Sequence, residues 1–146
     1  MVIVLVTKDE EPQFREMVME YWRFVIPGSF TLTDPIQAEA EFQQRYQWSG
    51  GNNNPHWILV DNRPVGFLMM RVYEDGVTAY IHDFYLTPDA RRQGYGSKIF
   101  RTLQEQLKDQ GVGQIYLSVQ ADNPVALDFW KKPGFRIIYR RLVQSI

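Results

Sequence analysis

The sequence predicts an α/β (α+β) fold with the element order βααβββαβαβ. An apolar run followed by a helical repeat opens the chain, and three strand-like segments joined by short turns occupy its middle. Helical and strand-like segments then alternate. The three consecutive strands indicate an antiparallel meander, and the later alternation adds strands separated by helices.

The composition limits the class of protein before any motif is considered. With 146 residues and 45% hydrophobic content, the chain suits one domain, residues 1–146. The formal charge of -1 gives no overall basic field, so we expect no nucleic acid and no membrane as a partner. The absence of cysteine excludes disulfides, thiolate metal sites and a cysteine nucleophile. The first apolar run, Val2 to Val6, is too short for a signal peptide or a membrane span, which predicts a soluble cytoplasmic protein.

Two helices are expected after a first strand at Val2 to Val6. Residues of the first recur at helical spacing until Pro27-Gly28 stops them: Phe14, Met17, Val18, Tyr21 and Val25. Asp34 followed by Pro35 is typical of a helix start. The second helix has a weaker apolar face: Ile36, Ala40, Phe42 and Tyr46. The stretch from Ser49 to Pro55 has nothing to build a core and is expected to be a mobile loop.

Three strands should follow, at His56 to Val60, Val65 to Tyr73 and Thr78 to Leu86, joined by the turns "DNRP" and "EDG". Strict alternation in the third strand predicts two faces. One face would carry Tyr80, His82, Phe84 and Leu86, and the other Ala79, Ile81, Asp83 and Tyr85.

The last third of the chain predicts an amphipathic helix after Gly96, a strand at Gln114 to Val119, a short helix after Asn123-Pro124 and a strand from Phe135 onwards. The first of these helices turns its apolar residues to the sheet: Ile99, Phe100, Leu103 and Leu107.

An anion site is indicated where that helix begins. Gly94 and Gly96 carry no side chains there, so backbone N–H groups and the positive end of the helix dipole can meet a phosphate. Arg91, Arg92 and Lys98 add local positive charge. The alternative is a surface turn with glycines needed for packing. A P-loop and a dinucleotide fingerprint are both excluded by spacing.

The segment Arg91-Arg92-Gln93-Gly94-Tyr95-Gly96 resembles the acyl-CoA signature of the GNAT N-acetyltransferases, in which Arg or Gln is followed after two residues by Gly-x-Gly or Gly-x-Ala. The segment "NPVALDFWKKPGF", residues 123–135, resembles a second element of that family. The resemblance covers roughly residues 56–140 and implies a sheet of six to seven strands with helices on both faces. It also implies an acetyl-CoA-dependent N-acetyltransferase that needs no metal and acts on a primary amine of a small molecule or peptide.

The resemblance also implies how acetyl-CoA would be held. Backbone N–H groups from Arg92 to Ser97 would wrap the diphosphate, and the pantetheine arm would pair with the strand edge at Tyr85, Leu86 and Thr87. Asn123 would contact pantetheine or cap its helix, and Trp130 would stack on pantetheine or pack in the core. The cofactor residues are thus Tyr85, Leu86, Thr87, Arg91, Arg92, Gln93, Gly94, Tyr95, Gly96, Ser97, Lys98, Asn123 and Trp130.

The chemistry requires a base, because an ammonium group has no lone pair with which to attack a thioester. His82 is the first candidate, since an imidazole with a pKa of about 6.5 is mostly neutral near pH 7. Members of the family sometimes place the base, or the anchor of a water relay, at the position of Tyr80. Asp83 is the competitor, and it would alternatively fix a neighbouring helix or bind a cationic acceptor. The alternative for His82 is a strand histidine that only packs.

Two departures from the family pattern matter. Trp130 stands where the family usually has a tyrosine that protonates the leaving thiolate, so Tyr80, Tyr85 and Tyr116 are the candidate replacements, and a non-catalytic acyl-CoA sensor is the alternative function. After Phe135 the sequence shows one long strand and no turn to a seventh. Either the seventh strand is absent or a second copy covers the edge in a homodimer.

The acceptor pocket is expected between the first two helices and the strand that carries His82. Its candidate residues are Glu20, Tyr21, Trp22, Phe24, Phe30, Glu39 and Trp48. Acidic side chains there would suit a cationic amine, although a solvated helix face explains them equally well.

Overall fold

The computed structural model describes residues 1–25, 34–46, 54–119 and 123–146. Four of the expectations above concern residues outside these ranges. They are the helix stop at Pro27-Gly28, most of the loop from Ser49 to Pro55, and the acceptor candidates Phe30 and Trp48.

The described residues form one mixed five-stranded sheet in the order β1-β2-β3-β4-β5. The strands are β1 (Val2–Leu5), β2 (Asn54–Val60), β3 (Arg63–Val72), β4 (Thr78–Leu86) and β5 (Gln114–Leu117). The first four pair antiparallel as the predicted meander requires, and β5 pairs parallel to β4. The α/β fold class is therefore confirmed.

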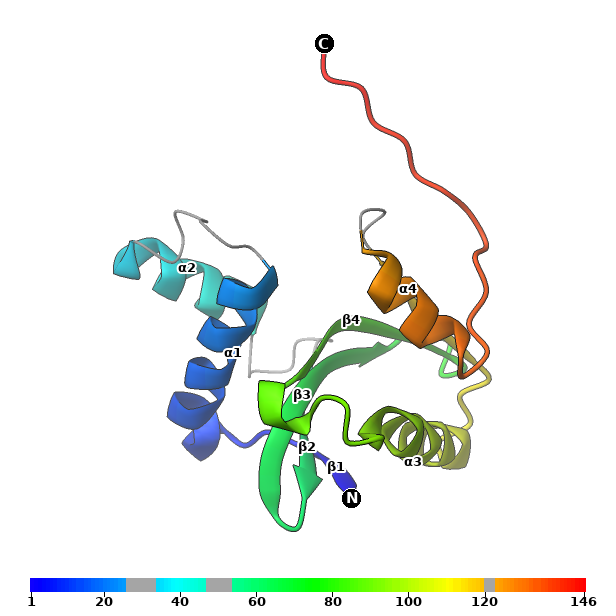
Figure 1. Ribbon diagram of the computed structural model, residues 1–146, viewed down its shortest axis with the longest axis horizontal. Coiled ribbons are helices and arrows are strands. Elements are labelled where there is room, and N and C mark those ends of the chain that lie inside the picture. Colours follow the sequence, from blue (N-terminus) through cyan, green and yellow to red (C-terminus); the bar gives the residue numbers. More distant parts are fainter. Residues whose placement is uncertain (26–33, 47–53, 120–122) are drawn as a thin grey trace.

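Helices cover both faces of the sheet (Figure 1). One face carries α1 (Glu11–Val25) and α2 (Pro35–Arg45), and the other carries α3 (Tyr95–Asp109) and α4 (Pro124–Lys131). Single turns of 3-10 helix, η1 (Lys8–Glu10) and η3 (Pro88–Ala90), precede α1 and follow β4. No helix in the described ranges is long and apolar enough to cross a membrane.

The starts of α2 and α4 and the turn between β2 and β3 lie where local sequence signals predicted them. Asp34 Oδ1 accepts hydrogen bonds from the backbone N–H groups of Ile36 at 3.0 Å and Gln37 at 3.4 Å, which caps α2. Asn123 Oδ1 caps α4 by accepting from Ala126 N at 3.0 Å. Asp61 and Asn62 take positive φ angles of 50° and 60°, which suits the two-residue turn between β2 and β3.

The apolar faces of α1 and α2 differ in part from those predicted. On α2 the buried residues are Ala38 and Phe42, while Ile36 is 82% exposed. These two residues lie four positions apart, and the buried Tyr46 continues the same spacing. This row of side chains is buried because it packs against the aromatic cluster around Phe14. On α1, Trp22 is buried in that cluster rather than lining an acceptor pocket.

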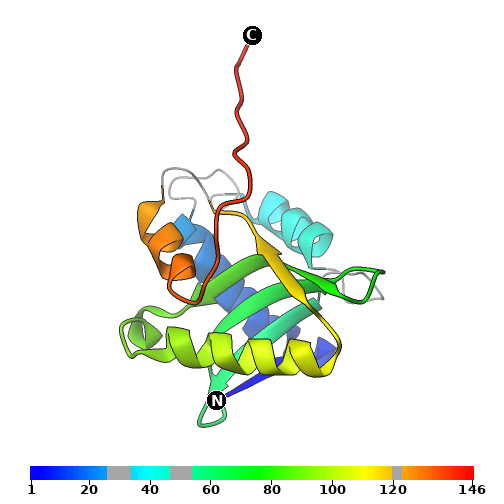
Figure 2. The ribbon, with the colours of Figure 1, turned by 90° about the vertical axis from the view of Figure 1, so that its right-hand side faces the viewer.

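The predicted sixth strand from Phe135 is wrong, as is the sheet of six to seven strands. Phe135 packs against the rings of Phe100 and Trp130, and Gly134 before it takes a φ of 110°. The chain then runs away from the body of the molecule in both views (Figures 1 and 2). The segment 136–146, here called the tail, forms no strand and does not join the sheet beside β5.

Candidate active site

Strands β4 and β5 part halfway along β4. Their pairing runs from Thr78↔Gln114 to Ile81↔Leu117 and stops there. In the ranges that the structure describes, the edge of β4 from His82 to Leu86 has no strand partner on the β5 side. This free edge contains Tyr85 and Leu86, two of the three residues predicted to pair with pantetheine. The third, Thr87, donates its N–H to Val65 O at 2.9 Å.

A β-bulge lies at the point where the two strands part. Asp83 pairs with Met69 and Ile81 pairs with Met70, so His82 is the extra residue. The predicted alternation is therefore wrong across the bulge. Ala79 and Ile81 pack in the same core as Phe84 and Leu86, against α3. Tyr80 instead shares the α1 and α2 face with Asp83 and Tyr85, since one extra residue reverses the alternation.

His82 has an exposed side chain whose ring centroid lies 4.6 Å from that of Tyr80. Partial loss of water around the ring lowers its pKa below the ordinary value. The Asp83 carboxylate opposes this shift, and the Arg71 and Arg45 cations add to it. The imidazole is therefore neutral near pH 7 and able to accept a proton.

The three tyrosines considered as replacement acids are placed differently. The Tyr80 hydroxyl lies 2.6 Å from Ser118 Oγ, just beyond the end of β5 where the strands part. Tyr116 donates its hydroxyl to Gln114 at 3.0 Å. Burial, followed by hydrogen bonding to Glu20, raises the pKa of Tyr85 to about 12. Only the Tyr80 hydroxyl thus lies beside the bulge.

Asp83 anchors both N-terminal helices to β4. Its side chain is buried and accepts hydrogen bonds from Tyr21 at 3.0 Å, from Arg45 Nε and Nη2 at 3.1 and 2.8 Å, and from Tyr46 at 3.4 Å. Burial and the adjacent Asp83 charge raise the pKa values of Tyr21 and Tyr46, so both remain donors. These contacts agree with the alternative in which Asp83 fixes a neighbouring helix, and its roles as a base or as a ligand of a cationic acceptor stay predictions.

The start of α3 offers unpaired N–H donors. Gly94 is its N-cap with a φ of 73°, and Arg92 also takes a positive φ of 62°. No side chain caps this end within the described ranges. The side chains of Ser97 and Lys98 are exposed beside it. Such a left-handed turn leading into an uncapped helix is a suitable cradle for a diphosphate.

Gly94 and Gly96 are glycine for different structural reasons. A Cβ on Gly94 would meet nothing within 4 Å, so its glycine serves the left-handed backbone. A Cβ on Gly96 would lie 2.6 Å from Phe129 Cε2, so that glycine lets α4 pack on α3. The packing alternative therefore applies to Gly96, and the anion site at Gly94 stays a prediction.

Arg91, Gln93 and Trp130 have partners within the chain. Arg91 donates from Nε to Leu86 O at 2.9 Å, and its guanidinium lies 4.0 Å from the Phe24 ring centroid. Gln93 Nε2 lies 3.4 Å from Asp89 O. The Trp130 ring, 7% exposed, meets the rings of Phe84, Phe100, Phe129 and Phe135 edge-on. Trp130 is thus a core aromatic, and its contact with CoA stays a prediction.

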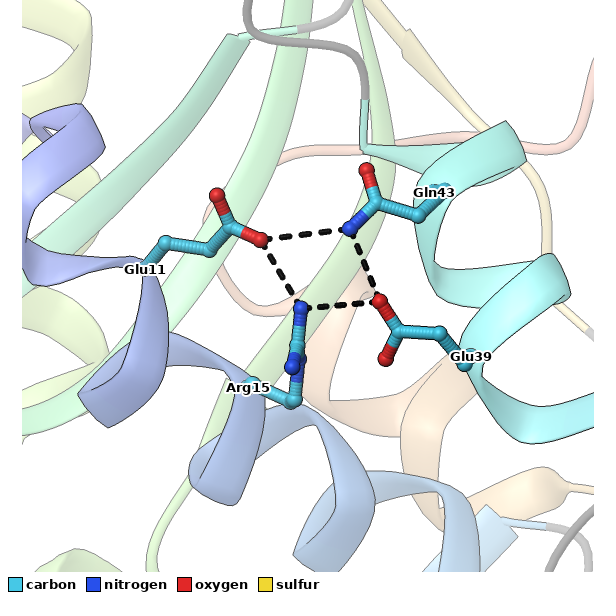
Figure 3. Close-up of polar contacts among 4 residues, drawn as sticks. All are labelled: Glu11, Arg15, Glu39 and Gln43. Atoms are coloured by element: carbon cyan, nitrogen blue, oxygen red, sulfur yellow. Dashed lines mark hydrogen bonds and ion pairs between the residues drawn. The ribbon is translucent and has the colours of Figure 1, made fainter. Parts of the chain in front are cut away.

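Glu39 is engaged between the two N-terminal helices (Figure 3). Arg15 Nη2 contacts Glu11 Oε1 at 2.8 Å and Glu39 Oε1 at 3.0 Å, and Gln43 Nε2 donates to the same two oxygens. This cluster explains Glu39 without an acceptor. Glu20 instead lies near Tyr85 and contributes to its raised pKa.

Sequence reasoning missed Arg45, Arg71 and Ser118. Arg45 and Arg71 are isolated cations, and no spacing rule links them to β4 before the bulge and the α2 position are known. For Arg45, a signal was available in Asp83, because a carboxylate on a half-buried strand needs a cationic or hydrogen-bonding partner.

Two cavities in the structure lie away from His82. One of about 440 Å³ adjoins Tyr95 and the β2–β3 turn, and one of about 390 Å³ lies between β1 and the end of α3. Neither cavity is lined by Tyr80, His82 or Asp83.

Comparisons with known proteins agree with this geometry. The model of the acetyltransferase (GNAT) family matches residues 12–135. The thialysine N-epsilon-acetyltransferase of Sus scrofa is 39% identical over 61 residues, which is 42% of this chain and 36% of that protein. The chain thus spans about a third of that relative.

A match of wider extent is the ribosomal protein bS18 alanine N-acetyltransferase of Salmonella typhimurium, 26% identical over 73% of this chain and 78% of that protein. An aminoglycoside N-acetyltransferase solved in complex with CoA has a TM-score of 0.67 at 14% identity, covering 99% of this chain and 93% of that one. It shows that the folds agree. Since the family model matches well over half of the residues, the chain belongs to the GNAT acetyltransferase family.

Proposed function

We propose that this protein is an N-acetyltransferase that moves the acetyl group of acetyl-CoA to a primary amine of a small molecule or peptide by direct attack in a ternary complex. The observation that carries the proposal is the parting of β4 from β5 at His82, in a chain whose next helix, α3, begins without a side-chain cap. Acetyl-CoA would supply the acyl group as a reactive thioester. Residues of this chain would bind acetyl-CoA, take the proton of the amine and protonate the departing thiolate.

The residues present fit acetyl-CoA. The N–H groups from Arg92 to Ser97 would hold the diphosphate, with Lys98 adding charge. The free backbone edge of β4 would hold the pantetheine arm as an added strand. The positive φ angles of Arg92 and Gly94 support this assignment, because a left-handed turn at the start of a helix can point successive backbone N–H groups toward an anion.

His82 would take the proton of the attacking amine, directly or through a water molecule. Its lowered pKa keeps it neutral at pH 7, and its place in the bulge puts it at the inner end of the free edge. Tyr80 would protonate the departing thiolate, since its hydroxyl lies at the end of β5 and its ring contacts His82. Asp83 would act as a positioning residue that holds α1 and α2 beside this pair.

The alternative function, a non-catalytic acyl-CoA sensor, is favoured by Trp130, which is buried in the core at the usual position of the family's acid. Thiol release distinguishes the two functions, because a sensor binds acetyl-CoA without consuming it when amines are added.

We propose further that the protein is a homodimer. The tail carries exposed apolar side chains, Ile137, Ile138, Tyr139, Leu142 and Val143, and β5 is an edge strand within the described ranges. If the tail of one copy lay along the β5 edge of a second copy, it would cover both the exposed apolar side chains and the unpaired strand edge. Cytoplasmic localisation and a single domain over residues 1–146 stay predictions.

Thermal unfolding with acetyl-CoA and with free CoA tests the proposed function first. A ligand at a hundred times its dissociation constant stabilises the folded state by about 2.7 kcal/mol. Gly94→Glu should abolish the stabilisation, because the new carboxylate would fill and repel the diphosphate site. Gly111→Glu is the matched control, since Gly111 also has a positive φ (86°) and open space but lies after the far end of α3. No shift in the midpoint with either ligand at millimolar concentration would refute both the transferase and the sensor.

A further inference from the structure

Arg71 is a charged residue on the acceptor side of the sheet that the proposed reaction does not use. It pairs with Tyr80 across β3 and β4, so its side chain shares the face of Tyr80, Asp83 and Tyr85. Its Nε atom is buried without a hydrogen-bond partner, and its guanidinium lies 4.8 Å from the Tyr73 ring centroid. No carboxylate in the described ranges forms an ion pair with it.

The charges near His82 do not balance. Arg45 is neutralised by the buried Asp83, with which it forms two hydrogen bonds. Among the residues that the structure describes, Arg71 therefore remains as the uncompensated cation beside Tyr80 and His82. A plain alkylammonium ion approaching the base would be repelled by this charge, whereas a molecule that also carries an anion would be attracted.

The spacing fits a short acceptor. Arg71 and His82 are close to diagonal neighbours on antiparallel strands, whose side chains begin about 7–8 Å apart. Two hydrogen bonds of about 2.9 Å and a few covalent bonds bridge that distance. Guanidinium groups bind carboxylates through paired N–H donors, and no carboxylate of the described residues occupies those of Arg71.

We propose that Arg71 is the specificity residue of this site and that the acceptor is an amino acid, a primary amine with a carboxylate a few bonds away. Arg71 binds the carboxylate while the amine lies at His82. This inference rests on the proposed N-acetyltransferase function and names its substrate class.

Two matched series of compounds test the proposal. The first contains ω-amino acids with one to five methylene groups between amine and carboxylate, and the second contains the alkylamines of the same lengths. Binding is measured by calorimetry with free CoA present, so no turnover occurs, and kcat/KM is measured by thiol release from acetyl-CoA. We expect at least one amino acid to exceed its alkylamine by about 10- to 100-fold in both measurements, as a charged hydrogen bond would give.

The variants separate recognition from folding. Arg71→Gln should remove the advantage of the amino acids, so that each one binds and reacts no better than its alkylamine of the same length, while Arg71→Lys should keep part of the advantage. Arg101→Gln is the matched control, because Arg101 is an exposed arginine of α3 on the other side of the sheet. Arg101→Gln should retain the full ratio of amino acid to alkylamine in both binding and kcat/KM.

The outcomes are distinct for the two proposals. Alkylamines that equal the amino acids throughout, or a ratio unchanged in Arg71→Gln, would overturn the role of Arg71 and leave the transferase intact. Carboxylate-dependent binding that Arg71→Gln abolishes, with no thiol release from any amine, would overturn the transferase and support the recognition site.

Discussion

At the scale of single residues, His82 owes its position to one inserted residue in β4. The bulge places its imidazole against Tyr80, beside the cations of Arg45 and Arg71. In a regular strand the same residue would face the α3 core together with Phe84. A polar residue at a bulge can face the reaction without being buried, which makes bulges suitable positions for catalytic groups.

The lowered pKa of His82 predicts the pH dependence of the reaction. The base works when neutral, so kcat/KM should rise with pH through a value below 6.5 and be level by pH 7. His82→Gln should reduce kcat/KM by about 100-fold or more and remove this acidic limb. The measurement is the pH profile of kcat/KM from pH 5 to 9.

The other histidine of the chain provides the control. His56 lies on β2, with Nδ1 2.8 Å from Asn54 O, and is not part of the proposed site. His56→Gln should keep the acidic limb of the profile. The same limb in His82→Gln would mean that another group is the base.

At the scale of secondary-structure elements, Asp83 is the point where β4, α1 and α2 meet. Asp83→Asn should lower the free energy of unfolding by about 2–4 kcal/mol, because it places an amide against the donors of Tyr21 and Arg45. The lower part of this range reflects the exposure of Arg45, whose side chain is 52% accessible. Urea denaturation measures the loss.

The cluster of Figure 3 supplies a matched control for that loss. Glu39 also accepts from an arginine between α1 and α2, but its side chain is 46% exposed. Glu39→Gln should therefore cost less than about 1 kcal/mol. Equal losses in the two variants would show that Asp83 is no special anchor.

Sequence predicted those elements whose signals are local. The Asp34 and Asn123 caps, the β2–β3 turn and the α3 pattern all depend on residues within a few positions of one another. The bulge was not predictable in this way, because it results from pairing between Met69 and Met70 of one strand and Ile81 and Asp83 of another. The anchor of Asp83 likewise needed the position of α2. The proposed anion site at Gly94 could be predicted because its signature is contiguous in the sequence, whereas Arg71 is brought beside Tyr80 only by the register of β3 and β4.

At the scale of the whole molecule, the proposed homodimer depends on the tail. Exposed side chains such as Leu142 and Val143, 92% and 95% accessible, contribute no packing within one chain. Removal of residues 136–146 should therefore leave the free energy of unfolding per monomer unchanged and convert the proposed dimer to a monomer. Sedimentation equilibrium at several concentrations measures the mass. Equal masses for the full and shortened chains would rule out a tail-mediated dimer.

The parting of β4 from β5 also divides one strand into two classes of amide hydrogen. Those between Thr78 and Ile81 lie between two neighbouring strands, whereas those from His82 to Leu86 that point toward the gap have only water as an acceptor. In deuterated solvent the second class should exchange quickly in the free protein and slowly once pantetheine lies along the edge. The strand that forms the site would then report, residue by residue, how far into the gap a ligand extends.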